Sequence, residues 1–342
     1  MSELQNRLSE ITAKKDYKLI PEIPNKNLLI EITNKCNCNC IFCANSKMIR
    51  SRKNIDDKFI YKVLNEAYEL GVREVGFYTT GESMLNENLY DYIKYAKTIG
   101  YNYVYLTTNG ILLDENSMIK LVKNGIDSIK ISINAINKED YKLIHGVDCF
   151  NLVINNLKYL FNFREKNKLP FKIYVSYIAT KYTDYKINVI RDFFIKYCDD
   201  VAIINVRNQS GMMPEINDLL LCEEDATKVQ GRRLVPCHYV FDTINITSEG
   251  YITACCTDFE NYLAYADLNK VSIKEAWTNE LITLLRKKHL ENKLEGTLCA
   301  NCIYDSKICP SALSKEYVEI DNFEKVLYND KVTNRLKKYK KL

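Results

Sequence analysis

A repeated alternation of strand-like and helix-like segments constrains the fold of this chain more than any other feature. Short apolar or alternating runs predict strands at residues 28–32, 74–78, 103–107, 128–133, 172–178 and 201–206. Helical periodicity lies between them, at residues 56–70, 88–99, 115–123, 138–144, 152–167 and 185–197. Gly71, Gly100 and Gly125 follow three of these helical segments, as glycine often does at a helix end.

Six strands that alternate with helices through short connections predict an α/β fold with a parallel sheet and outer helices. Right-handed crossovers would curl such a sheet into a partial (β/α)6 TIM-like barrel, with its chemistry at the carboxyl ends of the strands. We expect a lead-in at residues 1–27, this barrel at 28–210, and a small cysteine-rich domain at 230–310. A helical tail would follow at residues 311–342, where a basic helix end is usually solvated.

The composition narrows the class of protein. The net charge of +4 is too small to favour nucleic acid or a membrane surface as a partner. The polar N-terminus lacks the apolar segment of a signal peptide, and no apolar run reaches the length of a membrane span. We therefore expect a cytoplasmic protein, in which 13 cysteines would bind metal or react rather than form disulfides.

Three cysteines lie in a loop directly after the first predicted strand. Cys36, Cys40 and Cys43 have the spacing C-x3-C-x2-C, and three thiolates can bind three irons of a [4Fe–4S] cluster. The fourth iron would then be open to a substrate or cofactor. Chance would place this spacing in about 2% of chains with this many cysteines. A zinc loop is the other alternative, but zinc needs a fourth ligand and no histidine is nearby.

This loop, with the aromatic Phe42 before its last cysteine, resembles the signature of radical S-adenosylmethionine (SAM) enzymes. The resemblance implies that SAM chelates the open iron and is cleaved to a 5′-deoxyadenosyl radical, which removes a substrate hydrogen atom. It also implies a flavodoxin- or ferredoxin-type electron donor. Cys38 is not part of the family spacing, and we interpret it as a bystander.

Other strand ends resemble SAM-binding elements of the same family. Gly81 and Glu82 match its Gly-Gly-Glu motif, in which a carboxylate pairs with the SAM amino group, although Thr80 replaces the first glycine. The remaining matches are Asn109 in a T-N-G turn, and Ser132 with Asn134 in an S-x-N element. We expect His145 to form local hydrogen bonds rather than to act as a catalyst, and Arg207 to contact either SAM, substrate or a salt-bridge partner.

A second group of cysteines lies near the C-terminus. Cys237 and Cys255 flank Gly250, and a C-x-x-C pair follows at Cys299 and Cys302. Four thiolates would fully ligate a second [4Fe–4S] cluster, and four-cysteine zinc is an equal alternative on these residues alone. Cys256 could replace Cys255 as the ligand.

In the context of the barrel, this group resembles the auxiliary-cluster domain of radical SAM enzymes, in its single-cluster twitch form rather than the full SPASM form. The spacing is most similar to that of the aminocyclitol dehydrogenase of butirosin biosynthesis. The resemblance implies that Cys237, Cys255, Cys299 and Cys302 bind one auxiliary cluster and that Cys309 is a bystander. We expect Cys149, Cys198 and Cys222 to be helix or core thiols, although Cys222 lies near the domain junction.

The two resemblances together imply an oxidoreductase whose auxiliary cluster accepts an electron from the substrate radical. The expected substrate is a small hydroxylated molecule, because the 27 residues before the first strand are too few for a leader-peptide-binding module. The alternatives are the maturation of a peptide or protein, delivered by a separate partner, and a zinc-stabilised binding module without redox chemistry.

Overall fold

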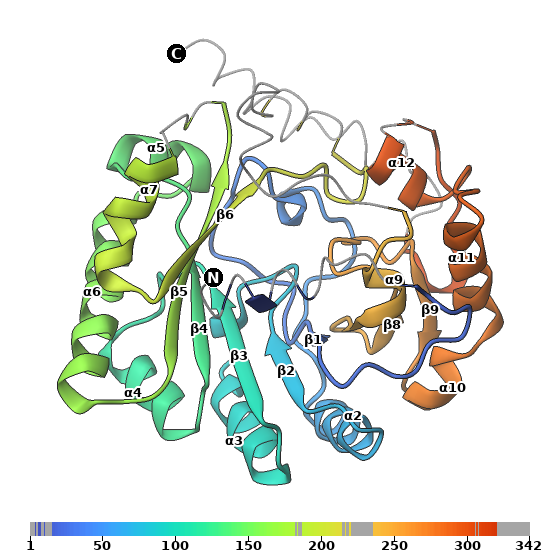
Figure 1. The fold of residues 1–342 in the computed structure, drawn as a ribbon, viewed down its shortest axis with the longest axis horizontal. Helices are drawn as coiled ribbons and strands as arrows, with labels where there is room; N and C mark the ends of the chain where they lie inside the picture. Colours follow the sequence, from blue (N-terminus) through green and yellow to red (C-terminus); the bar gives the residue numbers. More distant parts are fainter. Residues whose placement is uncertain are drawn as a thin grey trace.

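The computed structural model describes residues 4, 6, 7, 10, 16–181, 183, 187–213, 216, 219, 235–304, 306 and 308–319. Its centre is a parallel sheet whose strands follow the chain order β1 to β6 (Figure 1). The six strands are β1 (Leu28–Ile30), β2 (Glu74–Phe77), β3 (Tyr103–Thr108), β4 (Ser128–Ser132), β5 (Lys172–Ala179) and β6 (Asp200–Asn205). The α/β class and the parallel partial barrel expected from the sequence are confirmed.

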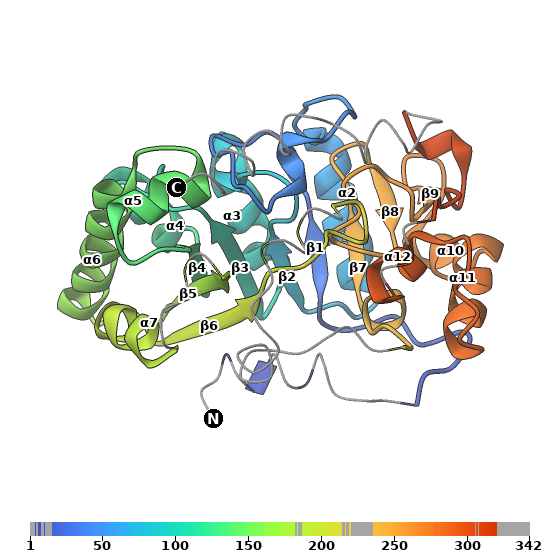
Figure 2. The same ribbon diagram turned by 90° about the horizontal axis from the view of Figure 1, so that it is seen from above.

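Helices cover the outer face of this sheet (Figure 2). They are α2 (Asp57–Glu69), α3 (Leu89–Ile99), α4 (Glu115–Lys123), α5 (Lys138–His145), α6 (Phe150–Asn167) and α7 (Ile187–Phe194). Side-chain caps mark several starts: Asp56 accepts the backbone N–H of Phe59, and Asp114 accepts that of Ser117. Glycines in the left-handed conformation end α3 and α5, at Gly100 and Gly146.

The strands separate a packed outer face from a more open inner face. In β3 the buried residues Val104 and Leu106 alternate with the half-buried Tyr103, Tyr105 and Thr107. Because successive side chains of a strand point to opposite faces, the buried set packs against the helices and the half-buried set faces the barrel interior. The inner face is thus accessible, as a binding site requires.

The C-terminal region continues the same sheet instead of forming a separate irregular unit. Strand β7 (Ile244–Ile246) pairs in parallel with β1, and β8 (Tyr251–Thr253) and β9 (Ala264–Asp267) follow it in antiparallel order. The result is a nine-stranded sheet with β6 at one edge and β9 at the other. The sequence predicts a small cysteine-rich domain here without strands, because strands of three or four residues are too short to show a periodicity.

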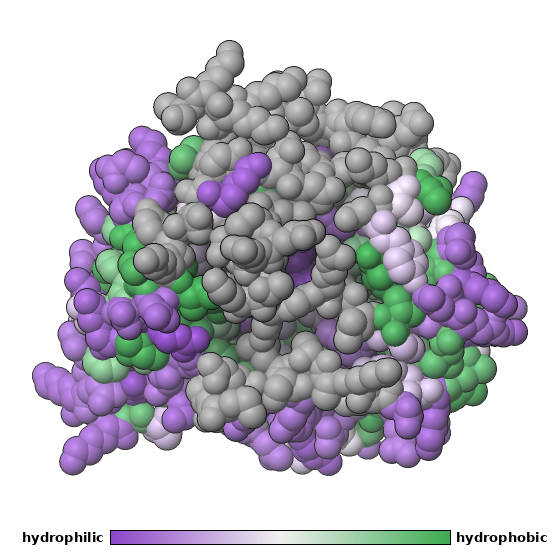
Figure 3. Space-filling view, turned by 45° about the horizontal axis from the view of Figure 1, so that its top comes forward, coloured by the Kyte–Doolittle hydropathy of each residue, from purple (hydrophilic) through white to green (hydrophobic). Residues whose placement is uncertain are grey.

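Four helices pack beside these last strands: α9 (Tyr239–Asp242), α10 (Ile273–Trp277), α11 (Glu280–Leu290) and α12 (Leu298–Tyr304). In the view of Figure 3, hydrophilic side chains dominate the described periphery of the molecule. No described helix is long and apolar enough to cross a membrane. Cys222, residues 320–342 of the predicted helical tail and part of the N-terminal lead-in lie outside the described residues.

Candidate functional site

The first cysteine loop occupies the carboxyl end of β1 and is fixed on both sides. Its middle is held by α5, since the backbone N–H groups of Asn39 and Ile41 donate to the carbonyls of His145 and Ile144, both at 2.9 Å. Residues 51–53 hold its start. The side-chain amide of Asn34 donates to the carbonyl of Ser51 and accepts from the backbone N–H of Lys53. These bonds make the loop a fixed platform for its thiols.

The loop brings the side chains of Cys36, Cys38 and Cys40 close together, and backbone N–H groups donate to two of its sulfurs. The backbone N–H of Cys38 donates to the Cys36 sulfur at 3.4 Å, and that of Asn45 donates to the Cys43 sulfur at 3.5 Å. The neighbouring Cys38 thiol and burial raise the pKa of Cys36, so this sulfur keeps its proton unless a metal displaces it. Cys38 also contacts Cys40, so it lies nearer to the predicted ligands than its bystander interpretation implied.

The ends of β2 and β3 are fastened to this loop. A Cβ added at Gly81 would lie 2.2 Å from the carbonyl oxygen of Thr33, so only glycine allows this approach. The backbone N–H of Glu82 donates to the carbonyl of Lys35 at 2.8 Å. The Asn109 amide donates to the side chain of Asn37 at 2.7 Å. The structure thus brings Gly81, Glu82 and Asn109, the predicted SAM-binding residues, against the cysteine loop.

Glu82 is a buried carboxylate held by neutral donors. Its two oxygens accept hydrogen bonds from the Thr108 hydroxyl at 2.8 Å, the Asn109 backbone N–H at 2.7 Å and the Met84 backbone N–H at 3.1 Å. Burial raises its pKa, and no Lys, Arg or His among the described residues forms an ion pair with it. An ammonium ligand would supply the missing positive charge.

The predicted SAM-binding residues at the end of β4, Ser132 and Asn134, form hydrogen bonds within the protein. The Asn134 side chain accepts the backbone N–H of Ile178 at 2.8 Å and lies 3.2 Å from Nε2 of His145. The Ser132 hydroxyl pairs with that of Ser176 at 3.1 Å. Phe42 is buried in the core, and the half-buried Arg207 follows β6.

The second group of cysteines lines one cavity. The four predicted ligands Cys237, Cys255, Cys299 and Cys302 all contribute, with apolar neighbours such as Val240 and Leu263. The Ser210 and Thr257 hydroxyls lie 3.4 Å and 3.2 Å from the Cys255 sulfur. Cys309 is exposed, and the buried Cys198 donates its S–H to the carbonyl of Phe194.

Cys256 is directed to a different place from Cys255. It does not line the cavity, but it contributes to the electrostatic environment of Tyr78, Tyr105 and Lys130. Tyr105 and Lys130 occupy half-buried strand positions that face the barrel interior, and the Lys130 ammonium lies 5.4 Å from the Tyr78 ring centroid. Cys255 therefore lines the cavity, whereas Cys256 lies near side chains of the barrel interior.

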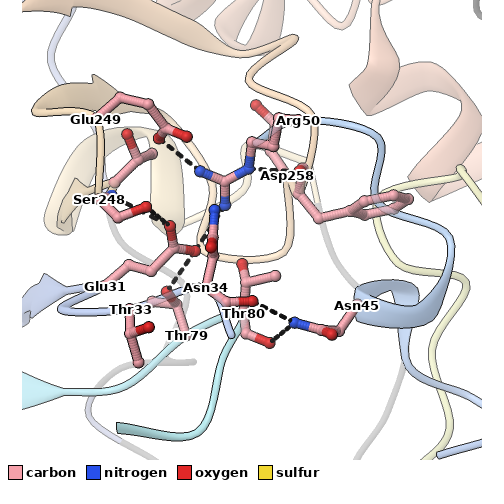
Figure 4. A network of polar contacts seen from close by, with 12 residues as sticks. Glu31, Thr33, Asn34, Asn45, Arg50, Thr79, Thr80, Ser248, Glu249 and Asp258 are labelled. Atoms are coloured by element: carbon pink, nitrogen blue, oxygen red, sulfur yellow. Dashed lines mark hydrogen bonds and ion pairs between the residues drawn. The ribbon is translucent and has the colours of Figure 1, made fainter. Parts of the chain in front are cut away.

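A buried cation joins the first cysteine loop to the C-terminal domain (Figure 4). The Arg50 guanidinium lies between Glu31 at 2.7 Å and Glu249 at 2.6 Å, and its Nε donates to the carbonyl of Phe259 at 2.8 Å. Burial opposes ionisation of Glu31, but Arg50 outweighs it and holds the pKa of this carboxyl below its ordinary value. Ser248 donates to the other oxygen of Glu31 through its N–H and its hydroxyl.

A tight turn after β6 contacts both cysteine groups. The Gln209 amide donates to the carbonyl of Phe42 at 3.2 Å, and the Asn208 amide donates to the carbonyl of Cys302 at 3.3 Å. Gln209, Ser210 and Gly211 all have positive φ, and a Cβ on Gly211 would lie 2.8 Å from the backbone nitrogen of Cys302. The turn thus fixes the position of one cysteine group relative to the other.

Two family models match the chain over the regions just described. Residues 30–169 match the radical SAM superfamily, and residues 237–303 match SPASM, an iron-sulfur cluster-binding domain. The chain thus carries a radical SAM domain and a SPASM domain. A radical SAM domain implies a [4Fe–4S] cluster and SAM, and a SPASM domain implies auxiliary iron–sulfur clusters. The zinc-module alternative finds no support in these matches, because the second one is to a cluster-binding family.

Similar curated proteins share part of this chain. The uncharacterized protein MJ0804 of Methanocaldococcus jannaschii is 32% identical over 189 residues, which cover 55% of this chain and 54% of that protein. A probable GTP 3′,8-cyclase of Saccharolobus islandicus is 35% identical over 135 residues, or 40% of this chain and 43% of that protein. The chain thus spans about half the length of the curated relatives that it matches.

Solved structures share the fold at low identity. Streptococcus suis SuiB bound to precursor peptide SuiA has a TM-score of 0.61 and 15% identity over 92% of this chain and 79% of that one. BtrN in complex with AdoMet and 2-DOIA has a TM-score of 0.55 and 16% identity, and the match covers 87% of this chain and 99% of that one. Tagged anSMEcpe with bound AdoMet has a TM-score of 0.58 and 15% identity, and the match covers 91% of this chain and 98% of that one.

The residues of this structure fit the groups that the family implies. Four thiols around one largely apolar cavity match the ligand set of a fully ligated [4Fe–4S] cluster. A buried carboxylate without an ion-pair partner among the described residues, Glu82, matches the amino group of SAM. Among the described residues, no three Cys, His, Asp or Glu side chains converge as ligands of a single ion, whereas a cubane takes each thiolate on a different iron.

Sequence reasoning missed the residues that connect these sites. Arg50, Asn208, Gln209 and Ser210 belong to no motif recognised in the sequence, and their partners are distant in the chain. The only local signal was the run Asn208-Gln209-Ser210-Gly211, whose residue types are typical of turns.

Proposed function

We propose that this chain is a radical SAM oxidoreductase that oxidises a small hydroxylated molecule inside the barrel. When bound, SAM with the first cluster supplies a 5′-deoxyadenosyl radical, and the second cluster accepts an electron. With one cluster held by Cys36, Cys40 and Cys43 and the other by Cys237, Cys255, Cys299 and Cys302, these groups would supply a hydrogen-atom acceptor and a one-electron acceptor. A substrate alcohol that also gave up its hydroxyl proton to solvent would then be oxidised to a carbonyl.

The placement of Cys255 and Cys256 is the observation that carries the proposal. Cys255 lines the four-cysteine cavity, and Cys256 lies near side chains of the barrel interior. Cys256 is joined by one peptide bond to Cys255, a predicted ligand of the second cluster. An electron from a substrate in the interior would therefore have a short path to that cluster. The buried Cys237, Cys255 and Cys299 would also keep water away from the second cluster.

The chain's own residues have distinct roles in this proposal. Cys36, Cys40 and Cys43 hold the first cluster, and Glu82 accepts the SAM ammonium in place of a protein cation. Cys237, Cys255, Cys299 and Cys302 hold the second cluster. Gly81 allows the SAM-binding turn to approach the loop.

The barrel interior favours a polar substrate. Tyr78 and Tyr105 offer hydroxyl groups, and Lys130 offers an ammonium group for which the described residues provide no ion-pair partner. Groups of this kind bind hydroxyl substituents by hydrogen bonds. BtrN, crystallised with AdoMet and 2-DOIA, has the same fold and binds a small molecule in that complex.

Anaerobic reconstitution followed by iron and sulfide analysis tests the cluster assignment. We expect about eight irons per chain, and about four in a Cys299→Ser variant. A Cys309→Ser variant, which removes an exposed thiol nearby, is the matched control and should keep all of them. An unchanged iron content in Cys299→Ser would remove the second cluster from these residues.

SAM cleavage then tests the chemistry. With dithionite as reductant, wild type and Cys299→Ser should both release 5′-deoxyadenosine, whereas Cys36→Ala should release none. A panel of aminocyclitols, sugars and short peptides identifies the substrate class by increased cleavage. An increase with peptides alone would favour peptide maturation, the reaction class suggested by the SuiB complex with SuiA.

A further inference from the structure

One imidazole connects the first cysteine loop to the end of β4. His145 is the last residue of α5, has 1% of its surface exposed, and stacks on Tyr141 with ring centroids 4.1 Å apart. Its Nδ1 lies 3.5 Å from the sulfur of Cys40, and its Nε2 lies 3.2 Å from the backbone nitrogen of Asn134. The ring therefore contacts a predicted cluster ligand on one side and a strand end on the other.

The contact with Asn134 decides which ring nitrogen carries the proton. A backbone N–H can only donate, so Nε2 of His145 must accept with its lone pair. A ring with a free lone pair on Nε2 is the neutral tautomer protonated at Nδ1. The Asn134 side-chain amide, also 3.2 Å from Nε2, can donate to the same lone pair. The Nδ1–H group consequently points to Cys40.

Backbone hydrogen bonds hold the His145 ring and the Cys40 sulfur next to each other. The carbonyls of Ile144 and His145 accept the backbone N–H groups of Ile41 and Asn39, which flank Cys40. A Cβ on Gly146 would lie 2.8 Å from the carbonyl oxygen of Asn39, so the helix end and the loop are in direct contact. The position of the His145 ring relative to the Cys40 sulfur is therefore set by backbone contacts between two segments, and not by the rotamer of His145 alone.

We propose that His145 is a positioning residue that donates its Nδ1–H to the Cys40 sulfur and stabilises the reduced state of the first cluster. This inference rests on the proposed function, in which Cys40 is a cluster ligand. A hydrogen bond to a ligand sulfur favours the state with more negative charge, and such bonds are among the determinants of iron–sulfur potentials. Its effect is large because the ring is shielded from water.

A redox titration monitored by electron paramagnetic resonance (EPR) tests the inference on anaerobically reconstituted full-length protein. The first cluster is identified by the change of its signal on addition of SAM. In His145→Phe, which keeps a ring for Tyr141 but has no donor, we expect the ratio of reduced to oxidised cluster at a fixed potential to fall roughly tenfold. This corresponds to a midpoint lower by ~59 mV for a one-electron couple.

Two further variants separate the hydrogen bond from packing. Tyr141→Phe keeps the stack and removes a hydroxyl for which the described residues provide no partner, so the midpoint should not move. His145→Asn places an amide donor near the position of Nδ1 and should recover part of the shift. Equal midpoints in wild type and His145→Phe, at equal iron content, would overturn the inference.

A measurement on the unmutated protein guards against a variant that fails to fold. The chain has three histidines, so labelling with 15N-histidine and recording hyperfine spectra of the reduced first cluster reports nitrogen coupled to it. We expect a weak 15N coupling that persists in His289→Gln and is absent from the unlabelled protein. A cluster that assembles and cleaves SAM without this coupling refutes the role of His145 alone. A protein that loads no first cluster refutes the proposed function as well.

Discussion

Replacing Arg50 by methionine should destabilise the protein more than any other single change of a charge described above. The Arg50 side chain is 1% exposed, and it contacts two carboxylates from different parts of the chain, Glu31 and Glu249. Removing one partner of a buried ion pair costs about 3–5 kcal/mol, because the remaining charge is left in a medium of low polarity. Glu31 is 2% exposed and has no other cation among the described ion pairs, so we expect the full range to apply.

Urea unfolding under anaerobic conditions, followed by circular dichroism, measures this change in the free energy of unfolding. Adding Glu31→Gln to Arg50→Met removes the stranded charge, so the double variant should be more stable than Arg50→Met alone. Lys270→Met breaks an ion pair with Glu316 in which both side chains are largely exposed, and it should leave the unfolding midpoint unchanged. A loss below about 1 kcal/mol in Arg50→Met, with an unchanged denaturant slope, would refute the reasoning.

Three further predictions concern the two cysteine groups and their surroundings. Gly81→Ala should abolish SAM cleavage, since its methyl group would displace Thr33, while leaving the iron of the second cluster in place. Cys255→Ser should lose about four irons and Cys256→Ser none, as measured by iron and sulfide analysis. Burial raises the pKa of Glu260 to about 7 from 4.5. The folded state thus binds the extra proton, and the free energy of unfolding should fall as pH rises from 5 to 7, by at most about 1.4 kcal/mol per unit. Glu260→Gln should flatten this dependence, and an equal slope in both proteins would contradict the assignment.

The barrel was predictable because its elements are long and regular. The predicted strand at residues 103–107 and the helix at 115–123 agree with β3 and α4 to within one residue. Alternation of period two and of period 3.6 is a local property, so it can be seen in the sequence without any tertiary contact. The strands of the C-terminal region could not be found in this way, because Ile244–Ile246 is too short to show a period and is ordered by pairing with β1.

The candidate site, too, could be predicted from the sequence only where its features are local. The spacing of Cys36, Cys40 and Cys43 and of the Cys299 and Cys302 pair is local, so the sequence by itself indicates iron–sulfur chemistry. Whether Cys255 or its neighbour faces the cavity depends on the direction of the strand end, which spacing does not encode. Arg50 and Glu249 are 199 positions apart, so no sequence pattern could have paired them.

The parallel ladder between β1 and β7 restricts how the molecule can open. The backbone N–H of Glu31 donates to the carbonyl of Ile246 at 2.8 Å, and Leu28 to Ile30 are in register with Ile244 to Ile246. A hinge between the two halves would have to shear these main-chain bonds together with the Arg50 ion pairs. The first cysteine loop and the C-terminal strands should therefore move together as one body, because no single bond between them can break alone.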